Sequence, residues 1–194
     1  MRKRRRPRLT RDERTAYHEA GHAVAAFFEQ LRVRTATIKP DKVKGSLGHV
    51  SHYPKPSFHP DFETDARTER RVLAGVLTYL AGPAAERRAT GRATGSHDDY
   101  RNAMDMASRL CGSNESVGAL LRWMWVQARD LVTVHWSFIE AVARALLARR
   151  RLSGQEVREI ILNSGKLPTL LPSVVRNATV GPRKSKSGRR DSNP

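Results

Sequence analysis

The sequence predicts a compact, mainly α-helical domain with one small β-hairpin. Apolar residues recur at helical spacing through most of the chain, whereas the alternation typical of strands occurs only over residues 33–38 and 48–53. No internal repeat is present, and a length of 194 residues suits one domain with a substantial core.

The first predicted helix runs from about Arg11 to Leu31. Thr10 and Glu13 have the spacing of a capping box, which starts a helix at this point. Apolar side chains follow at helical spacing and predict that one face of the helix is buried; they are Tyr17, Ala20, Gly21, Val24, Phe27, Phe28 and Leu31.

The hairpin and a loop are expected next. Residues 33–38 and 48–53 alternate as short strands do, and residues 45–48 offer a turn between them. Three prolines within residues 54–62 predict a loop after the second strand.

Five further helices complete the prediction. The second helix starts near Thr64, and Gly82 and Pro83 are expected to kink or restart it. The third starts around Asp98, and two more cover residues 120–131 and 135–150. The last helix begins at Ser153, where Glu156 completes a second capping box, and ends near Asn163.

The first helix contains the residues His18, Glu19, Ala20, Gly21 and His22, which form the H-E-x-x-H pattern of zinc peptidases. Residues four apart lie on one face of a helix, so both imidazoles can point at one ion. Glu19 can then take a proton from a zinc-bound water, whose pKa the metal lowers to about 7. The alternative is an amphipathic helix with two surface histidines, which the apolar surroundings of the motif disfavour.

Basic residues dominate both ends of the chain. The net charge is +17; residues 1–14 hold eight Lys or Arg against two acids, and residues 176–194 hold six against one. We therefore expect a basic disordered tail over 1–11, an ordered domain over 12–163 and a second disordered tail over 164–194. The tails act either as solubilising extensions or as electrostatic anchors for nucleic acid or anionic lipid, and composition does not separate these two roles.

The sequence also indicates the cellular compartment of the protein. It contains no run of 18 apolar residues, and no apolar segment follows the basic start as in a secretory signal. The single cysteine, Cys111, excludes an internal disulfide and is expected to be a packing residue. A reducing cytoplasm is the predicted location.

Three ordered blocks of the sequence resemble the FtsH-type zinc protease domain. They cover residues 17–25, 80–86 and 94–99, and residues 152–157 are similar to the closing helix of that family. The resemblance extends over about residues 12–163.

The resemblance implies a set of site residues. In that family the two motif histidines and an aspartate bind zinc, and the motif glutamate is the general base. Matching residue by residue gives His18, His22 and Asp99 as ligands of one Zn²⁺ per chain. Glu86 matches a helix glutamate that supports the site, and Glu86, His97 and Asp98 are the alternative ligands. His49, His52 and His59 have no counterpart and are expected to be solvated loop residues.

The resemblance further suggests that the second strand of the hairpin borders the cleft. Gly48, His49, Val50 and Ser51 would pair there with the extended backbone of a substrate. Such pairing contacts the main chain rather than side chains, so the selectivity of the enzyme is expected to be weak.

Departures from the family concern ATP and assembly. FtsH-type enzymes carry an AAA+ ATPase and transmembrane helices, whereas no G-x-x-x-x-G-K-[ST] loop occurs in this sequence. A separate AAA+ unfoldase is therefore expected to unfold folded substrates. A homo-oligomer is suggested only because members of the family form rings. Pro83 replaces the usual arginine of the second block.

These observations predict a zinc-dependent metalloendopeptidase that hydrolyses unfolded or loosely structured proteins. The alternative is a non-catalytic binding protein on the same scaffold, which docks on nucleic acid through its basic tails. An intermediate hypothesis is a protease tethered by these tails to substrates on nucleic acid. The intact H-E-x-x-H motif favours the enzyme.

Overall fold

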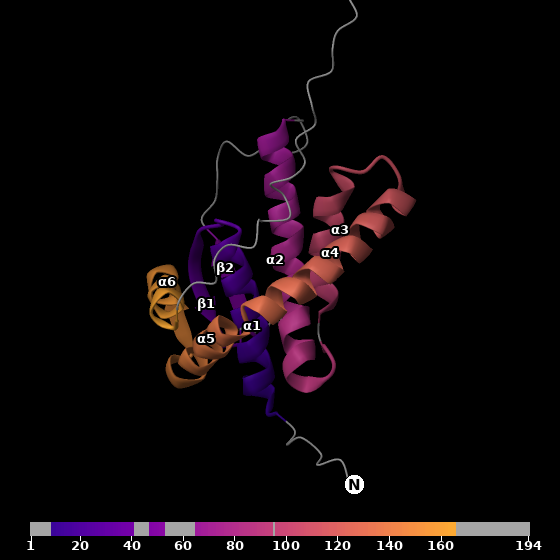
Figure 1. Cartoon of the computed structure of the whole chain (residues 1–194). Coiled ribbons are helices and arrows are strands. Elements are labelled where there is room, and N and C mark those ends of the chain that lie inside the picture. Colours follow the sequence, from indigo (N-terminus) through magenta and orange to yellow (C-terminus); the bar gives the residue numbers. More distant parts are fainter. Residues whose placement is uncertain (1–8, 41–46, 53–64, 95, 166–194) are drawn as a thin grey trace, which may run out of the picture.

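The computed structural model describes residues 9–40, 47–52, 65–94 and 96–165. The described part is mainly helical with a small sheet, as expected (Figure 1). Its elements are α1 (Arg11–Phe28), β1 (Val33–Thr37), β2 (His49–His52), α2 (Ala66–Thr90), α3 (His97–Ser108), α4 (Asn114–Val134), α5 (Trp136–Arg149), β3 (Arg151–Ser153) and α6 (Gly154–Asn163). The loop predicted over residues 54–62 and most of both predicted tails lie outside the described residues.

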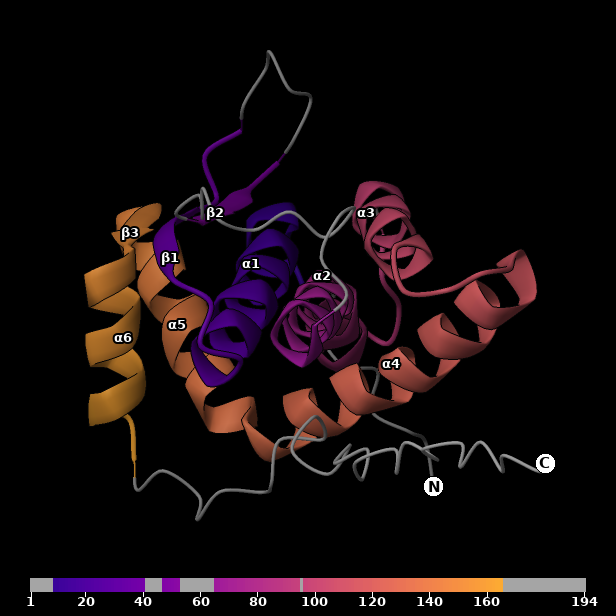
Figure 2. The ribbon, with the colours of Figure 1, turned by 90° about the horizontal axis from the view of Figure 1, so that it is seen from above.

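Helix α1 lies at the centre of the domain. It packs most extensively against α2 and then against α5, while α3 and α4 cover the side of α2 away from α1 (Figure 2). Both hydrogen bonds of the predicted capping box between Thr10 and Glu13 are present. The helix ends at Phe28 rather than Leu31, because Gln30 adopts a positive φ of 60° that a right-handed helix excludes.

Helix α2 is continuous across the predicted break. Asp65 caps its start by accepting a hydrogen bond from the Thr68 N–H. The restart expected at Gly82 and Pro83 does not occur, and Pro83 lies inside the helix. The surrounding turn is buried, so packing against α1 holds the helical path although proline supplies no N–H donor.

The sheet has three antiparallel strands in the order β2-β1-β3. The hairpin of β1 and β2 was expected, but β3 was not. Three residues are too short to show alternation, and β3 is fixed by tertiary packing: Leu152 is fully buried and pairs with Ala36 of β1. Strand β2 therefore lies at one edge of the sheet.

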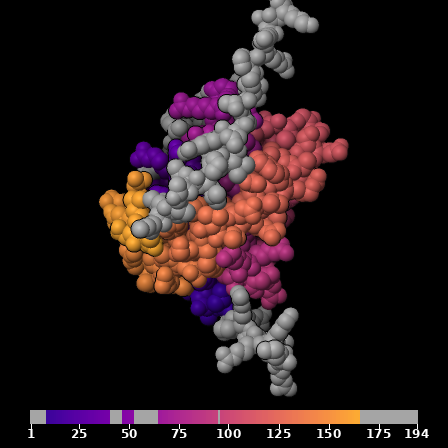
Figure 3. Space-filling model, viewed as in Figure 1, coloured from indigo at the N-terminus to yellow at the C-terminus, as the bar shows by residue number. Residues whose placement is uncertain are grey.

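The C-terminal helices complete the domain. Helix α4 begins earlier than expected, at Asn114, where the side chain of Ser113 accepts from the Ser116 N–H. The segment from α4 to α6 covers much of the face shown in Figure 3. No single helix in the described ranges is long and apolar enough to cross a membrane; α4 and α5 meet the length and composition criteria only as a pair, bent by 78°.

Candidate active site

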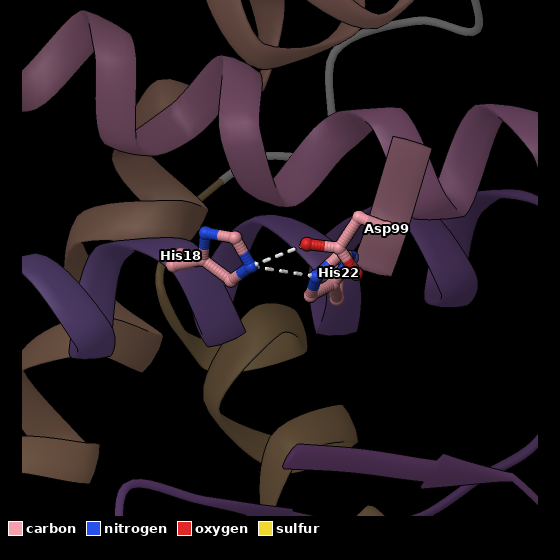
Figure 4. A group of neighbouring side chains, drawn as sticks. All are labelled: His18, His22 and Asp99. Carbon is pink, nitrogen blue, oxygen red and sulfur yellow. Dashed lines mark hydrogen bonds and ion pairs between the residues drawn. The ribbon is translucent and has the colours of Figure 1, made fainter. Parts of the chain in front are cut away.

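Two helices bring three potential metal ligands together. His18 and His22 project from one face of α1, and Asp99 comes from the first turn of α3 (Figure 4). His18 Nε2 lies 2.9 Å from Asp99 Oδ2 and 3.1 Å from His22 Nε2, and His22 Nε2 lies 3.4 Å from Asp99 Oδ1. One donor atom from each residue lies within 4.8 Å of the other two.

Helix α2 holds the opposite edge of each imidazole. His18 Nδ1 lies 3.3 Å from Glu86 Oε2, and His22 Nδ1 donates to the Thr78 carbonyl oxygen over 2.7 Å. These contacts place the ring proton on Nδ1 and leave Nε2 of both rings for a metal. The Thr78 carbonyl was not predicted, since a main-chain acceptor has no signal in the sequence.

Glu86 is a buried acid with two sets of partners. Besides His18, it accepts hydrogen bonds from the Thr94 N–H over 3.1 Å and from the Thr94 hydroxyl over 2.8 Å. Burial raises the pKa of Glu86, but the hydrogen bonds from His18 and Thr94 outweigh it and lower the pKa overall. Glu86 therefore stays ionised and holds His18 in place. Thr94 belongs to a block that was recognised, but its contact with Glu86 was not predicted.

Gly82 makes room for His22. A Cβ at this position would lie 2.3 Å from His22 Nε2 and 2.5 Å from His22 Cε1, so a larger residue would collide with the ring. The glycine that suggested a helix break instead lets the imidazole lie against α2. Sequence reasoning missed this role, because it depends on a contact between residues 60 positions apart.

Glu19 is buried beside this group. Burial raises the pKa of Glu19, and the neighbouring His22 and His18 partly offset the effect. A raised pKa suits a carboxylate that takes up and releases a proton. The backbone before β2 passes close to this side chain: a Cβ on Gly48 would lie 2.6 Å from Glu19 Oε1.

The histidines and the carboxylates are electrostatically coupled. Burial lowers the pKa of His18, but hydrogen bonds to Asp99 and Glu86 outweigh it and raise the pKa to about 10. Burial raises the pKa of Asp99, but His22 and His18 shift it well below its usual range. Without a metal, His18 is therefore protonated on both ring nitrogens near neutral pH, and a metal cation has to displace the proton from its Nε2.

A cleft of about 710 Å³ opens over these residues. Its wall includes Gly48, His49 and Val50, whereas Ser51 is not part of the wall, and its hydroxyl lies 2.7 Å from that of Thr35 on β1. The other lining residues are Arg11, Arg14, Thr15, His18, Glu19, His22, Leu47, His52, Thr78, Tyr79, Glu86, Thr94, Asp98, Asp99 and Asn102.

One expectation about histidines is changed by the structure. His49 and His52 lie in β2, within the predicted second strand, and are exposed as expected, but both also line the cleft. The expectation missed this position because it rested on the absence of a family counterpart. His59 lies outside the described residues.

The two residues before Asp99 stand apart from the cluster. His97 is exposed at the start of α3. The side chain of Asp98 is 78% exposed and forms an ion pair with Arg101. Among the described residues, the group that could hold a metal consists of His18, His22 and Asp99.

The chemistry of this donor set fits zinc. Two imidazole nitrogens and one carboxylate oxygen are typical protein ligands of a catalytic zinc, which keeps a further position open. The Nδ1 atoms of the two histidines contact Glu86 and the Thr78 carbonyl, and contacts of this kind orient the imidazole ligands of a metal. With the buried Glu19 alongside, the arrangement can activate water.

Comparisons with known proteins agree with this chemistry. The model of peptidase family M41 matches residues 7–113, which is more than half of the chain. The chain is 29% identical to the ATP-dependent zinc metalloprotease YME1L1 of Mus musculus, over 79% of this chain and 24% of that protein. It is 28% identical to the ATP-dependent zinc metalloprotease FtsH 1 of Sorangium cellulosum, over 78% of this chain and 30% of that protein. The chain thus spans about a quarter of the length of such relatives.

Proposed function

The chain belongs to peptidase family M41, and on this premise we propose that it is a zinc-dependent metalloendopeptidase. Its substrates are peptide bonds in unfolded or loosely structured proteins. The observation that carries the proposal is the convergence of His18, His22 and Asp99 on one point beside the buried Glu19.

One zinc ion per chain would be held by Nε2 of His18, Nε2 of His22 and the carboxylate of Asp99. When bound, zinc supplies Lewis acidity, which makes water more acidic and polarises the carbonyl group of the scissile bond. Glu86 and the Thr78 carbonyl keep both imidazoles oriented toward the ion through Nδ1.

Glu19 is the general base of this mechanism. Its carboxylate accepts the proton of the attacking water and then passes that proton to the leaving amine. Burial raises the pKa of Glu19, which suits a group that must both accept and release a proton near neutral pH. Gly48 leaves the backbone beside β2 close to this carboxylate, where the scissile bond would lie.

The substrate is proposed to bind as an extended strand along β2. This strand lies at the edge of the three-stranded sheet, and its residues Gly48, His49 and Val50 line the cleft. The main-chain groups at such an edge can pair with an incoming backbone, with Gly48, His49, Val50 and Ser51 as the pairing residues.

Partners follow from the substrate class. The cleft acts on polypeptides, and a separate AAA+ unfoldase is the proposed source of unfolding, since the relatives are named ATP-dependent proteases. Three further points stay predictions: contact of the basic tails with nucleic acid or anionic surfaces, a homo-oligomer, and a cytoplasmic location.

Substitution of the general base tests the proposal. We expect the Glu19→Gln variant to keep its zinc, because glutamine removes no ligand, but to cleave peptides at least about 100-fold more slowly, as general bases contribute on the order of 10²–10⁴-fold. The measurement is hydrolysis of unfolded casein and of internally quenched peptides, with bound zinc determined in parallel.

A matched control is Glu159→Gln, which changes an exposed glutamate of α6 away from the cleft. The control should cleave at the wild-type rate. If Glu19→Gln also cleaves at the wild-type rate, Glu19 is not the base. If wild-type protein binds no zinc and cleaves nothing, the non-catalytic binding protein is the better description.

A further inference from the structure

Arg14 lies on the same face of α1 as the two histidines. Arg14, His18 and His22 are spaced four residues apart, so their side chains follow one another along the helix. Arg14 and Arg11 both line the cleft, next to the residues of the reaction. The spacing places the backbone of Arg14 about one helical turn, or about 5.4 Å along the axis, from that of His18.

The guanidinium of Arg14 is held in place but not neutralised. Its Nη1 donates to the Thr94 hydroxyl over 3.2 Å, and its Nε is buried without an acceptor among the described residues. No carboxylate of the described residues forms an ion pair with Arg14 or Arg11. Holding a partly buried cation without a counter-charge costs stability, which is typical of a group that awaits a ligand.

None of the described acids that line the cleft is paired with Arg14: Glu19 forms no ion pair with it, and the other three have other partners. Glu86 accepts from Thr94 and lies against His18, Asp99 lies against both histidines, and Asp98 pairs with Arg101. Among the described residues, Arg14 and Arg11 therefore face the cleft without a carboxylate partner. A carboxylate is the group that a guanidinium binds best, through paired charge-assisted hydrogen bonds.

We propose that Arg14, assisted by Arg11, forms a subsite for an acidic side chain of the substrate. This proposal rests on the peptidase function above. An extended peptide advances about 3.3 Å per residue, so a carboxylate held one helical turn from His18 belongs to a residue within about two positions of the scissile bond. The main-chain pairing along β2 is indifferent to side chains, and Arg14 adds to it a preference for aspartate or glutamate.

A competing role for Arg14 is to position the histidines. Its bond to Thr94 continues through Glu86 to His18, so loss of Arg14 could disturb the reaction centre itself. The two roles differ in one measurable respect. A positioning residue affects every substrate equally, whereas a subsite affects only substrates that carry the acid.

The test is a set of quenched peptides that differ by glutamate or glutamine at each of the three positions on either side of the scissile bond, all with amidated C-termini. For wild-type protein we expect one position where glutamate raises kcat/KM at least about fivefold, as a charge-assisted hydrogen bond at a partly exposed site would. Arg14→Gln should abolish this preference, so that the ratio of kcat/KM for the glutamate and glutamine peptides falls to about one, while Arg14→Lys should retain part of it. Arg144→Gln, on the exposed side of α5, makes the same charge change outside the cleft and should alter nothing.

The outcomes separate this subsite from the peptidase itself. Cleavage that depends on Glu19 but is equal for glutamate and glutamine peptides overturns the subsite alone. An equal loss on both peptides in Arg14→Gln assigns Arg14 to positioning and also overturns the subsite. The same peptides are also made with free C-termini; a preference for the free terminus that disappears in Arg14→Gln, with none for glutamate, overturns the side-chain subsite and assigns Arg14 to the chain terminus. No cleavage by any preparation rejects the peptidase proposal.

Discussion

His22 shows how the site is fixed at the scale of single residues. Its Nδ1 donates to the Thr78 carbonyl, its Nε2 faces His18 and Asp99, and its ring occupies the space where a side chain on Gly82 would begin. The ring therefore has one orientation before any ligand arrives. Such preorganisation matters because a metal ligand that turns by one rotamer no longer contributes to binding.

The Gly82→Ala variant tests this arrangement. The added methyl group would meet the His22 ring at 2.3 Å, so the ring must move, and we expect zinc affinity to fall about tenfold or more. Competition with a chromophoric chelator measures the affinity. Gly75→Ala is the matched control on the same helix, because its methyl group meets only the flexible end of Met106. Wild-type zinc affinity in Gly82→Ala would contradict the packing role of Gly82.

The sequence predicted part of this site and missed the rest for physical reasons. The helical spacing of His18 and His22 is local, so one stretch of sequence is sufficient to infer it. Asp99 was inferred only through a resemblance, because nothing local links α3 to α1. The Thr78 carbonyl and the space beside Gly82 depend on how α2 packs against α1, which no pattern in either helix specifies.

At the scale of elements, Ser153 joins the sheet to the last helix. It ends β3, which pairs with β1, and its hydroxyl caps α6 in a capping box with Glu156. Because β1 also pairs with β2, the same sheet supports the edge strand beside the cleft. The capping box was predicted and is confirmed, since its residues are close in sequence. Strand β3 was missed, because its pairing partner is more than a hundred residues away.

Removal of this cap should destabilise the domain measurably. We expect Ser153→Ala to lower the free energy of unfolding by about 1 kcal/mol, the usual cost of losing an N-cap side chain. Urea unfolding followed by circular dichroism measures the change. Ser164→Ala, at the other end of α6, serves as the control and should cost less. Equal stability of Ser153→Ala and wild type would show that the capping box contributes nothing.

At the scale of the whole molecule, His135 connects distant parts of the fold. It stands at the bend between α4 and α5, and its ring stacks on Phe28 at the end of α1 with a centroid distance of 3.7 Å. Burial lowers the pKa of His135 from 6.5 to about 4. The folded state therefore holds this ring neutral at a junction of three helices.

This burial predicts a loss of stability in weak acid. Above pH 6.5 the ring is neutral whether the chain is folded or not, but between pH 6.5 and about 4 only the unfolded chain takes up the proton. The contribution of His135 is thus complete above pH 6.5 and declines as the pH falls toward 4. In metal-free protein, His135→Phe should lose less unfolding free energy than wild type between pH 7 and 4.5. His97→Asn, which removes an exposed histidine, is the control; identical profiles for His135→Phe and wild type would reject the prediction.

The central claim is a three-ligand zinc site, and bound metal per chain tests it most directly. Protein is purified without added metal or an affinity tag, and zinc is measured for wild type, Asp99→Ala and Asp98→Ala. We predict one zinc per chain in wild type and in Asp98→Ala, whose side chain points to Arg101, and a clear loss in Asp99→Ala. Retention of zinc in Asp99→Ala, or no zinc in wild type after zinc is supplied, would contradict the account.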